Sequence, residues 1–318
     1  MKNYDLAIIG AGPIGLFATS FAQLHGLKTI TFEALEKIGG QPKYLYPAKQ
    51  IQDIPGFNKI TGNNLTNNLS AQIKDKEIIS NYRVQKIVPR EDDTFIIDNT
   101  FHVKSIILAT GLGAFTPKIL PLNIPKELKN NIHYFMPNPE YFDNKKIAIL
   151  GGGDSALDWA LELSTRSSVS LIHRRTAFRG LESSVNKLAT SKNVNFFTPF
   201  LPYRIESTSS NKIELTLKEV GGNNLIKEKF DELLVAYGFK SNNLQLRKWG
   251  LKLTQGLIEV NSFMETNLNG IYAVGDAITY PGRAPMIGVG FGEAQIAINK
   301  IMDTLFPEKK MTLHSNSL

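Results

Sequence analysis

The chain has 318 residues, a formal net charge of +7 and no cysteine, which excludes structural disulfides, thiolate metal sites and any dithiol redox pair. At this length two domains are expected, and no stretch approaches the roughly 20 apolar residues of a membrane span. We find no convincing secretory signal and expect a cytoplasmic protein.

The excess of basic residues has two interpretations. It is either the surface of an ordinary enzyme, or an attraction for an acidic partner, whose association it would speed. The sequence has no nucleic-acid motif, and no basic run with interleaved aromatic residues, so we expect neither a nucleic acid nor a membrane as partner.

The first βαβ pattern of the chain contains a dinucleotide fingerprint. Strands are predicted over 4–9 and 27–32 and a helix over 13–25, and a GxGxxG motif lies between the first strand and the helix. Its glycines allow a tight turn, bring backbone N–H groups to a pyrophosphate and let helix and strand pack closely. Glu33 ends the second strand, where an acid accepts from ribose hydroxyls. The pattern predicts a nucleotide with an unphosphorylated ribose, bound by Gly10, Gly12, Pro13, Ile14, Gly15 and Glu33.

The next segment is less regular. Gly39-Gly40-Gln41-Pro42 breaks the pattern, and residues 44–57 are interpreted as a long functional loop. A helix is predicted over 61–75, and apolar alternation predicts strands over 82–88, 94–97 and 101–108.

A second βαβ pattern begins at Lys145, with a helix over 154–165 and a strand over 168–172. Its fingerprint has alanine in the last glycine position, and His173-Arg174-Arg175 stands where the acid would be. An acid would repel a 2′-phosphate, whereas arginines hold one by charge-assisted bonds. The pattern predicts an NADPH site formed by Gly151, Gly153, Asp154, Ser155, Ala156, His173, Arg174, Arg175 and Arg179.

Further strands of the second unit are predicted over 193–219 and 225–236. The chain then returns to the first unit, with a strand predicted over 271–274 and a helix over 288–305. Asp276 follows the strand over 271–274, where an aspartate can bind a flavin ribityl hydroxyl, and the helix would direct its positive end toward the flavin. We therefore expect an α/β fold of two Rossmann-like domains. The FAD domain comprises 1–114 and 243–318, and the NADPH domain, 115–242, is inserted in it.

In combination these motifs resemble the flavoproteins of the thioredoxin reductase type over essentially the whole chain. The chain departs from that type at 133–139, because thioredoxin reductases carry a Cys-x-x-Cys just before the second fingerprint and this stretch has none. Without thiols the chain cannot reduce a disulfide by exchange. The motifs that carry the resemblance are Gly10-Ala11-Gly12-Pro13-Ile14-Gly15, Gly39-Gly40-Gln41, Asp53-Ile54-Pro55-Gly56-Phe57, Gly151-Gly152-Gly153-Asp154-Ser155-Ala156, His173-Arg174-Arg175 and Gly275-Asp276-Ala277.

One branch of that family lacks the dithiol, the ferredoxin/flavodoxin–NADP reductases of the thioredoxin-reductase-like type. The chain is similar to this branch at Leu45-Tyr46-Pro47, Gly113-Ala114-Phe115, Asp158-Trp159-Ala160 and Leu313-His314-Ser315. The resemblance implies a homodimer in which Tyr46 stacks on one flavin face and His314, from the tail of the other subunit, covers the opposite face. It also implies flavin contacts at Gly40, Gln41, Val84, Phe115 and Ser315.

The resemblance implies an FAD enzyme that takes a hydride from NADPH and passes electrons singly to ferredoxin or flavodoxin. The flavin carries the chemistry, so no catalytic side chain and no metal are expected. Two alternatives stay open: an NADPH reductase of small acceptors such as free flavin, quinone or a ferric complex, and a non-catalytic nucleotide-sensing flavoprotein. The arginine pair and the two complete fingerprints argue against the second alternative. The carrier, the direction of electron flow and the arrangement of the domains are left open.

Overall fold

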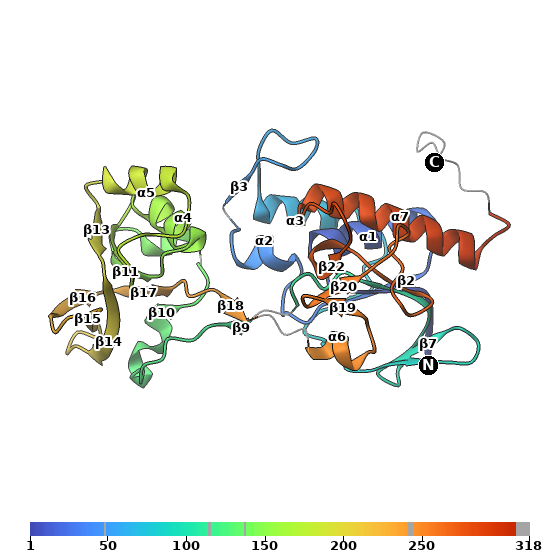
Figure 1. Cartoon of the computed structure of the whole chain (residues 1–318), viewed down its shortest axis with the longest axis horizontal. Coiled ribbons are helices and arrows are strands. Elements are labelled where there is room, and N and C mark those ends of the chain that lie inside the picture. The colour runs from blue at the N-terminus through green and yellow to red at the C-terminus, as the bar shows by residue number, and fades with distance from the viewer. Residues whose placement is uncertain (48, 114–115, 137, 241–243, 310–318) are drawn as a thin grey trace. The chain divides into compact units, whose positions relative to one another are not determined.

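The computed structural model describes residues 1–47, 49–113, 116–136, 138–240 and 244–309. The chain divides into two compact units, Met1–Phe115 with Ser241–Leu318, and Thr116–Lys240. Figure 1 shows that each unit has its own sheet and its own helices.

The sheet of the first unit has the strand order β5-β2-β1-β8-β7-β6, with β21 also paired to β8. β5, β2, β1, β8 and β21 run parallel, whereas β7 pairs antiparallel with both of its neighbours, β8 and β6. Since β21 follows the second unit in the chain, the last segment completes the first sheet. The bounds are β1 Lys2–Ile9, β2 Thr29–Phe32, β5 Ile78–Ile79, β6 Ile87–Pro89, β7 Phe95–Ile97, β8 Phe101–Leu108 and β21 Ile271–Ala273.

Three helices cover the first unit: α1 (Pro13–Leu24), α3 (Gly62–Ala71) and α7 (Ile287–Leu305). α1 and α7 run side by side over the sheet (Figure 1). Leu6, Ile8 and Ile106 are fully buried in the central strands. A parallel strand is enclosed on both of its faces, which explains why these strands are continuous apolar runs.

Short elements complete the unit: α2 (Gly40–Tyr44), α6 (Leu244–Lys248) and the 3-10 helix η3 (Gly275–Ala277), with β3 Gln50–Ile51, β4 Ile60–Thr61, β19 Leu253–Thr254, β20 Leu257–Glu259 and β22 Ile278–Thr279. Three predictions were wrong in detail. The strand predicted over 82–88 begins only at Ile87, the helix predicted to residue 75 ends at Ala71, and the glycines at 39 and 40 begin a short helix.

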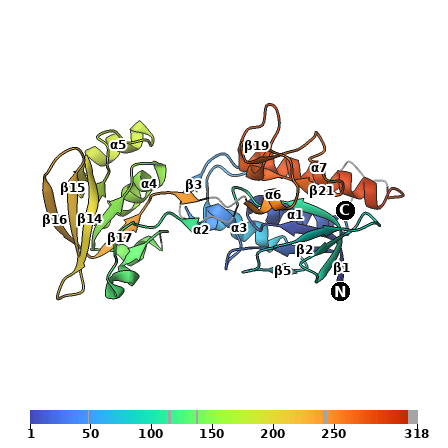
Figure 2. The same ribbon diagram turned by 60° about the horizontal axis from the view of Figure 1, so that its bottom comes forward.

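The second unit has a five-stranded parallel sheet with the order β10-β17-β11-β12-β13. An antiparallel sheet, β14-β15-β16, forms a separate layer beside it (Figure 2). The bounds are β9 Thr116–Pro117, η1 Lys126–Asn131, β10 Ile132–His133, η2 Pro139–Phe142, β11 Lys146–Leu150, α4 Asp154–Leu163, β12 Ser168–Ile172, α5 Glu182–Ala189, β13 Val194–Phe197, β14 Phe200–Ser207, β15 Ile213–Glu219, β16 Leu225–Phe230, β17 Glu232–Val235 and β18 Phe239–Lys240.

The side chains of β11 alternate between two hydrophobic cores of the second unit. Ile147 and Ile149 pack with side chains of α4 and α5, whereas Ala148 and Leu150 pack with side chains of β14, β15 and β16. Successive strand residues point to opposite faces, so one buried strand supplies both cores. The α/β class predicted from the sequence is confirmed for both units.

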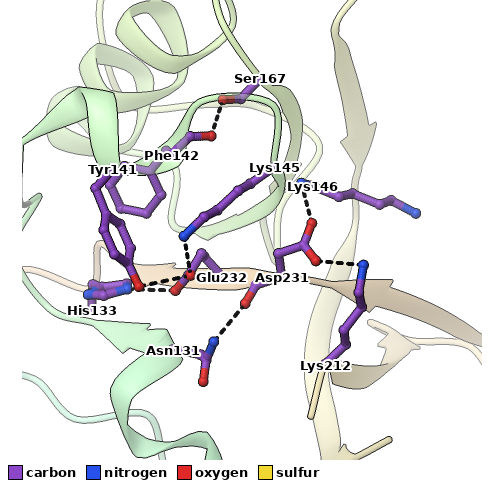
Figure 3. A network of polar contacts seen from close by, with 10 residues as sticks. All are labelled: Asn131, His133, Tyr141, Phe142, Lys145, Lys146, Ser167, Lys212, Asp231 and Glu232. Carbon is purple, nitrogen blue, oxygen red and sulfur yellow. Dashed lines mark hydrogen bonds and ion pairs between the residues drawn. The ribbon is translucent and has the colours of Figure 1, made fainter. Parts of the chain in front are cut away.

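A buried carboxylate, Glu232, ties together the start of the second sheet (Figure 3). It accepts hydrogen bonds from Lys145 Nζ at 2.7 Å and Tyr141 Oη at 3.0 Å, and lies 2.8 Å from His133 Nε2. Burial alone would raise the pKa of Glu232, but these partners hold it below its usual value. The network therefore fixes η2, β10 and the start of β11 around the first residue of β17.

Candidate functional site

An open cavity lies at the carboxyl ends of the parallel strands in the first unit. Ile9, Phe32, Ala109 and Val274, at or just beyond the ends of β1, β2, β8 and β21, all line it. β1 lies between β2 and β8, so the strand order reverses at β1. In open α/β sheets, ligands bind at such a reversal, outside the carboxyl ends of the strands. The sequence-predicted residues that line it are Gly10, Gly12, Pro13, Ile14, Glu33, Gly40, Gln41, Tyr46, Val84 and Asp276.

The first fingerprint fits the roles expected of its glycines. Gly10 has φ +107°, and a Cβ there would lie 2.4 Å from the carbonyl oxygen of Ala109. A Cβ on Gly15 would lie 1.9 Å from the carbonyl oxygen of Gly10, so this glycine permits close helix–strand packing and does not line the cavity. Gly12 caps α1, no side chain caps the helix, and Pro13 begins it. The helix therefore presents free N–H groups to an anion in the cavity.

The loop after β2 closes onto this fingerprint. Gly39 donates its N–H to Ala11 O at 2.8 Å, and a Cβ on Gly40, where φ is +57°, would lie 2.8 Å from Gly12 Cα. Only glycine allows this approach, which brings Gln41 to the cavity.

Glu33 is 6% exposed and lines the cavity. Its carboxylate accepts the N–H of Ala11 at 2.8 Å and of Leu35 at 2.9 Å. Burial raises the pKa of Glu33, and the N–H donors oppose this shift. Each carboxylate oxygen keeps a further lone pair, so the group is able to accept from ligand hydroxyls.

Tyr46, Asp276 and Thr110 form another part of the lining. Burial raises the pKa of Tyr46 to about 12, and the negative charges of Asp276 and Asp53 add to the shift. Thr110 Oγ1 is buried and has no hydrogen-bond partner among the described residues.

Sequence reasoning missed the part of the cavity lining that α6 and the residue after it supply. Gln245, Leu246 and Trp249 line the cavity, and the indole Nε1 of Trp249 donates to Gln85 O at 3.2 Å. The helix spans only five residues, too few for a periodic apolar pattern, so the sequence carried no signal for it.

The second fingerprint repeats the geometry of the first. A Cβ on Gly151 would lie 2.6 Å from the carbonyl oxygen of Ala236, as Gly10 faces Ala109. Gly153 caps α4 without a side-chain cap bond, and a Cβ there would meet no atom within 4 Å. Ala156 is buried, whereas Asp154 and Ser155 are exposed at the start of the helix. The start of α4 is thus open to a ligand.

His173 joins this fingerprint to the arginines. A Cβ on Gly152 would lie 2.5 Å from the His173 ring, which stacks on Phe178 with centroids 5.4 Å apart. The N–H of Arg179 donates to Gly152 O at 2.7 Å. Burial and the charges of Arg174, Arg175 and Arg179 lower the pKa of His173.

The three arginines, Arg174, Arg175 and Arg179, are exposed and lie close to the fingerprint in the chain fold. Their charges remain available for an anionic group. Phe115, His314 and Ser315, predicted as flavin contacts, lie outside the described residues. In the part of the chain that the structure describes, no cluster of histidines and carboxylates is arranged for a metal ion, and no helix is long and apolar enough to span a membrane.

Comparison with known proteins gives one consistent result. Residues 4–299 match the family described as pyridine nucleotide-disulphide oxidoreductase. The chain is 58% identical to a ferredoxin–NADP reductase from Lactobacillus johnsonii, covering 100% of both chains. It is 43% identical to one from Ligilactobacillus salivarius, covering 99% of this chain and 95% of that one.

The solved structures found are thioredoxin reductases and related enzymes. That of Lactococcus lactis in its FR conformation has a TM-score of 0.73 and 26% identity, covering 94% of this chain and 98% of that one. That of T. acidophilum has a TM-score of 0.75 at 22% identity, covering 96% and 99%, which is a likeness of fold alone.

Proposed function

The chain belongs to the pyridine nucleotide-disulphide oxidoreductase family, and we propose that it is an FAD-dependent ferredoxin–NADP reductase that uses NADPH. The observation that carries the proposal is the contrast between the two fingerprints. The first ends at a buried glutamate, Glu33, and the second at exposed arginines, Arg174 and Arg175. The full-length relatives named as ferredoxin–NADP reductases support the same activity.

The cavity of the first unit fits FAD. The uncapped start of α1 suits the pyrophosphate, and the Glu33 carboxylate suits the adenosine ribose. Asp276 lines the cavity, and its carboxylate would accept from ribityl hydroxyls. When bound, FAD supplies the exchange between a two-electron hydride donor and a one-electron carrier. The protein holds it, orients it and excludes water from it.

We propose that the second unit binds NADPH at the start of α4. The open space at Gly153 admits the pyrophosphate, and the guanidinium groups of Arg174 and Arg175 bind the 2′-phosphate, with Arg179 beside them. No side chain needs to transfer a proton. The stretch 133–139 has no cysteine, so no disulfide exchange competes with electron transfer to a carrier.

Several finer features are also proposals. They are a homodimer, a cytoplasmic location, flavodoxin as an alternative carrier to ferredoxin, and the stacking of Tyr46 and His314 on the flavin. The homodimer, the carrier and the stacking derive from the family resemblance, supported for Tyr46 by its place in the cavity lining beside Asp276.

The test is the coenzyme preference of arginine variants. Replacing Arg174 and Arg175 by serine should raise KM for NADPH and leave KM for NADH nearly unchanged. A charge-assisted hydrogen bond contributes about 1.5–3 kcal/mol, so each arginine should cost about ten-fold or more. Arg204→Ser is the matched control, because Arg204 is an exposed arginine of the same unit paired with Glu206 at 2.8 Å. Equal losses with both coenzymes would contradict the assignment of the 2′-phosphate site.

A further inference from the structure

Behind Asp276 lies a buried acid, Glu293, that sequence reasoning did not single out. Glu293 belongs to α7 and its side chain is 2% exposed. Its carboxylate accepts the N–H of Gly275 at 2.7 Å, the Tyr280 hydroxyl at 3.1 Å and Arg283 Nε at 2.9 Å. One carboxylate thus fixes the backbone of the cavity lining and a guanidinium together.

Arg283 connects this buried acid to the cavity. Its side chain is 7% exposed, and its Nη2 lies 3.5 Å from Asp276 Oδ1. Nη2 is buried and has no hydrogen-bond partner among the residues described. The distance is that of an ion pair, slightly too long for a hydrogen bond. Arg283 Nη2 therefore faces the Asp276 carboxylate and has no other acceptor among the described residues.

The charges explain why a guanidinium stands there. A buried arginine requires a counter-charge, and Arg283 lies between two carboxylates, of which Glu293 is buried and Asp276 is 44% exposed. Asp276 lines the cavity and Arg283 does not. Direct contact with a ligand in the cavity is therefore made by Asp276 and the loop that bears it, and not by Arg283.

We propose that Arg283 is a positioning residue for FAD: anchored by Glu293, it orients the Asp276 carboxylate toward the ligand's hydroxyl groups. This inference rests on the proposed function, since it takes FAD as the occupant of the cavity. The planar fork of the guanidinium is essential, because one side of it bonds Glu293 while Nη2 faces Asp276. An ammonium group at this position would keep the charge and lose one of the two contacts.

The test is a double-mutant cycle on FAD binding by the apoprotein, followed by quenching of FAD fluorescence. The variants are Arg283→Met, Asp276→Asn and the double variant, and the control is Arg90→Met. Arg90 is an exposed arginine of the same unit, 3.4 Å from Asp92. We expect Arg283→Met to weaken FAD binding about ten-fold in the native background and less than two-fold in the Asp276→Asn background. Arg90→Met should change it by less than two-fold.

Equal weakening in both backgrounds would show that Arg283 only holds the loop, and would overturn the proposal. So would an Arg283→Met variant that binds FAD as tightly as Arg90→Met does. If Arg283→Met does not fold, Arg283→Lys replaces it in the same cycle. Arg283→Lys should weaken FAD binding less than Arg283→Met, and this effect must also vanish in the Asp276→Asn background. Failure of the native apoprotein to bind FAD would instead refute the proposed function.

Discussion

Replacing Gly152 by alanine should impair the use of NADPH more than the use of NADH. Gly152 has no positive φ, so the backbone accepts alanine, and only space forbids it. The new methyl would lie 2.5 Å from the ring of His173. Carbon contacts are stable at about 3.5–4.0 Å, so the ring must move by about 1 Å against Phe178. Because Arg174 follows His173 directly, this movement displaces the arginines that we assign to the 2′-phosphate.

The expected size follows from the contact that this displacement removes. A charge-assisted hydrogen bond to the 2′-phosphate contributes about 1.5–3 kcal/mol, equivalent to about 10- to 150-fold in binding. We expect KM for NADPH to rise within this range and KM for NADH to rise less, both measured at steady state with the FAD-loaded protein.

Two variants control this prediction. Gly153→Ala adds a methyl to open space near the assigned pyrophosphate site, so it should impair both coenzymes alike. His173→Ala removes the clashing ring, so adding Gly152→Ala to it should cost little further. A Gly152→Ala variant with native KM for NADPH would refute the reasoning that His173 couples the glycine loop to the arginines.

Three further predictions concern other parts of the chain. Glu232→Gln should destabilise the protein by about 2–4 kcal/mol at pH 7, because it removes a buried charge that pairs with Lys145. Glu214→Gln, at an exposed ion pair, should cost less than about 1 kcal/mol. The folded-state pKa of Glu232 is lowered, so its contribution is present above the unfolded pKa and is lost as pH falls through the folded pKa. Denaturant unfolding at pH 7 and at acid pH checks the size of the loss and its pH dependence. Equal losses of unfolding free energy for Glu232→Gln and Glu214→Gln at pH 7 would contradict the stabilising role of the Glu232 network. Deleting residues 310–318 should change the rates of NADPH reduction, carrier reduction or reaction with oxygen while FAD stays bound; three unchanged rates would show that the resemblance at His314 is accidental. The reaction with an acidic carrier should slow as salt rises, because the net charge of +7 steers association, and a kcat/KM that is independent of salt would remove that argument.

The sequence was informative where backbone geometry restricts the choice of residue. Gly10 and Gly151 stand against carbonyl groups that exclude any side chain, so both fingerprints were visible without a structure. The bounds of β8 and β12 were predicted correctly, because apolar and polar residues alternate along the first part of each strand.

The rest depends on contacts between distant residues. Arg283 and Trp249 have no local signal, because their partners Glu293 and Gln85 meet them only in the fold. The glycine at 40 was interpreted as a break in the pattern, although its close approach to Gly12 allows a short helix to start there. Glu232 opens an otherwise apolar strand, and its three partners come from a segment about ninety residues earlier in the chain.

The central claim is electron transfer from NADPH through FAD to a carrier protein. The most direct measurement is NADPH oxidation by the pure FAD-loaded protein with ferredoxin, flavodoxin, free flavin, a quinone and oxidised thioredoxin as acceptors. The account predicts the highest kcat/KM for ferredoxin or flavodoxin, and no turnover with thioredoxin, because the chain has no cysteine. Turnover confined to the small acceptors, or any reduction of thioredoxin, would contradict it.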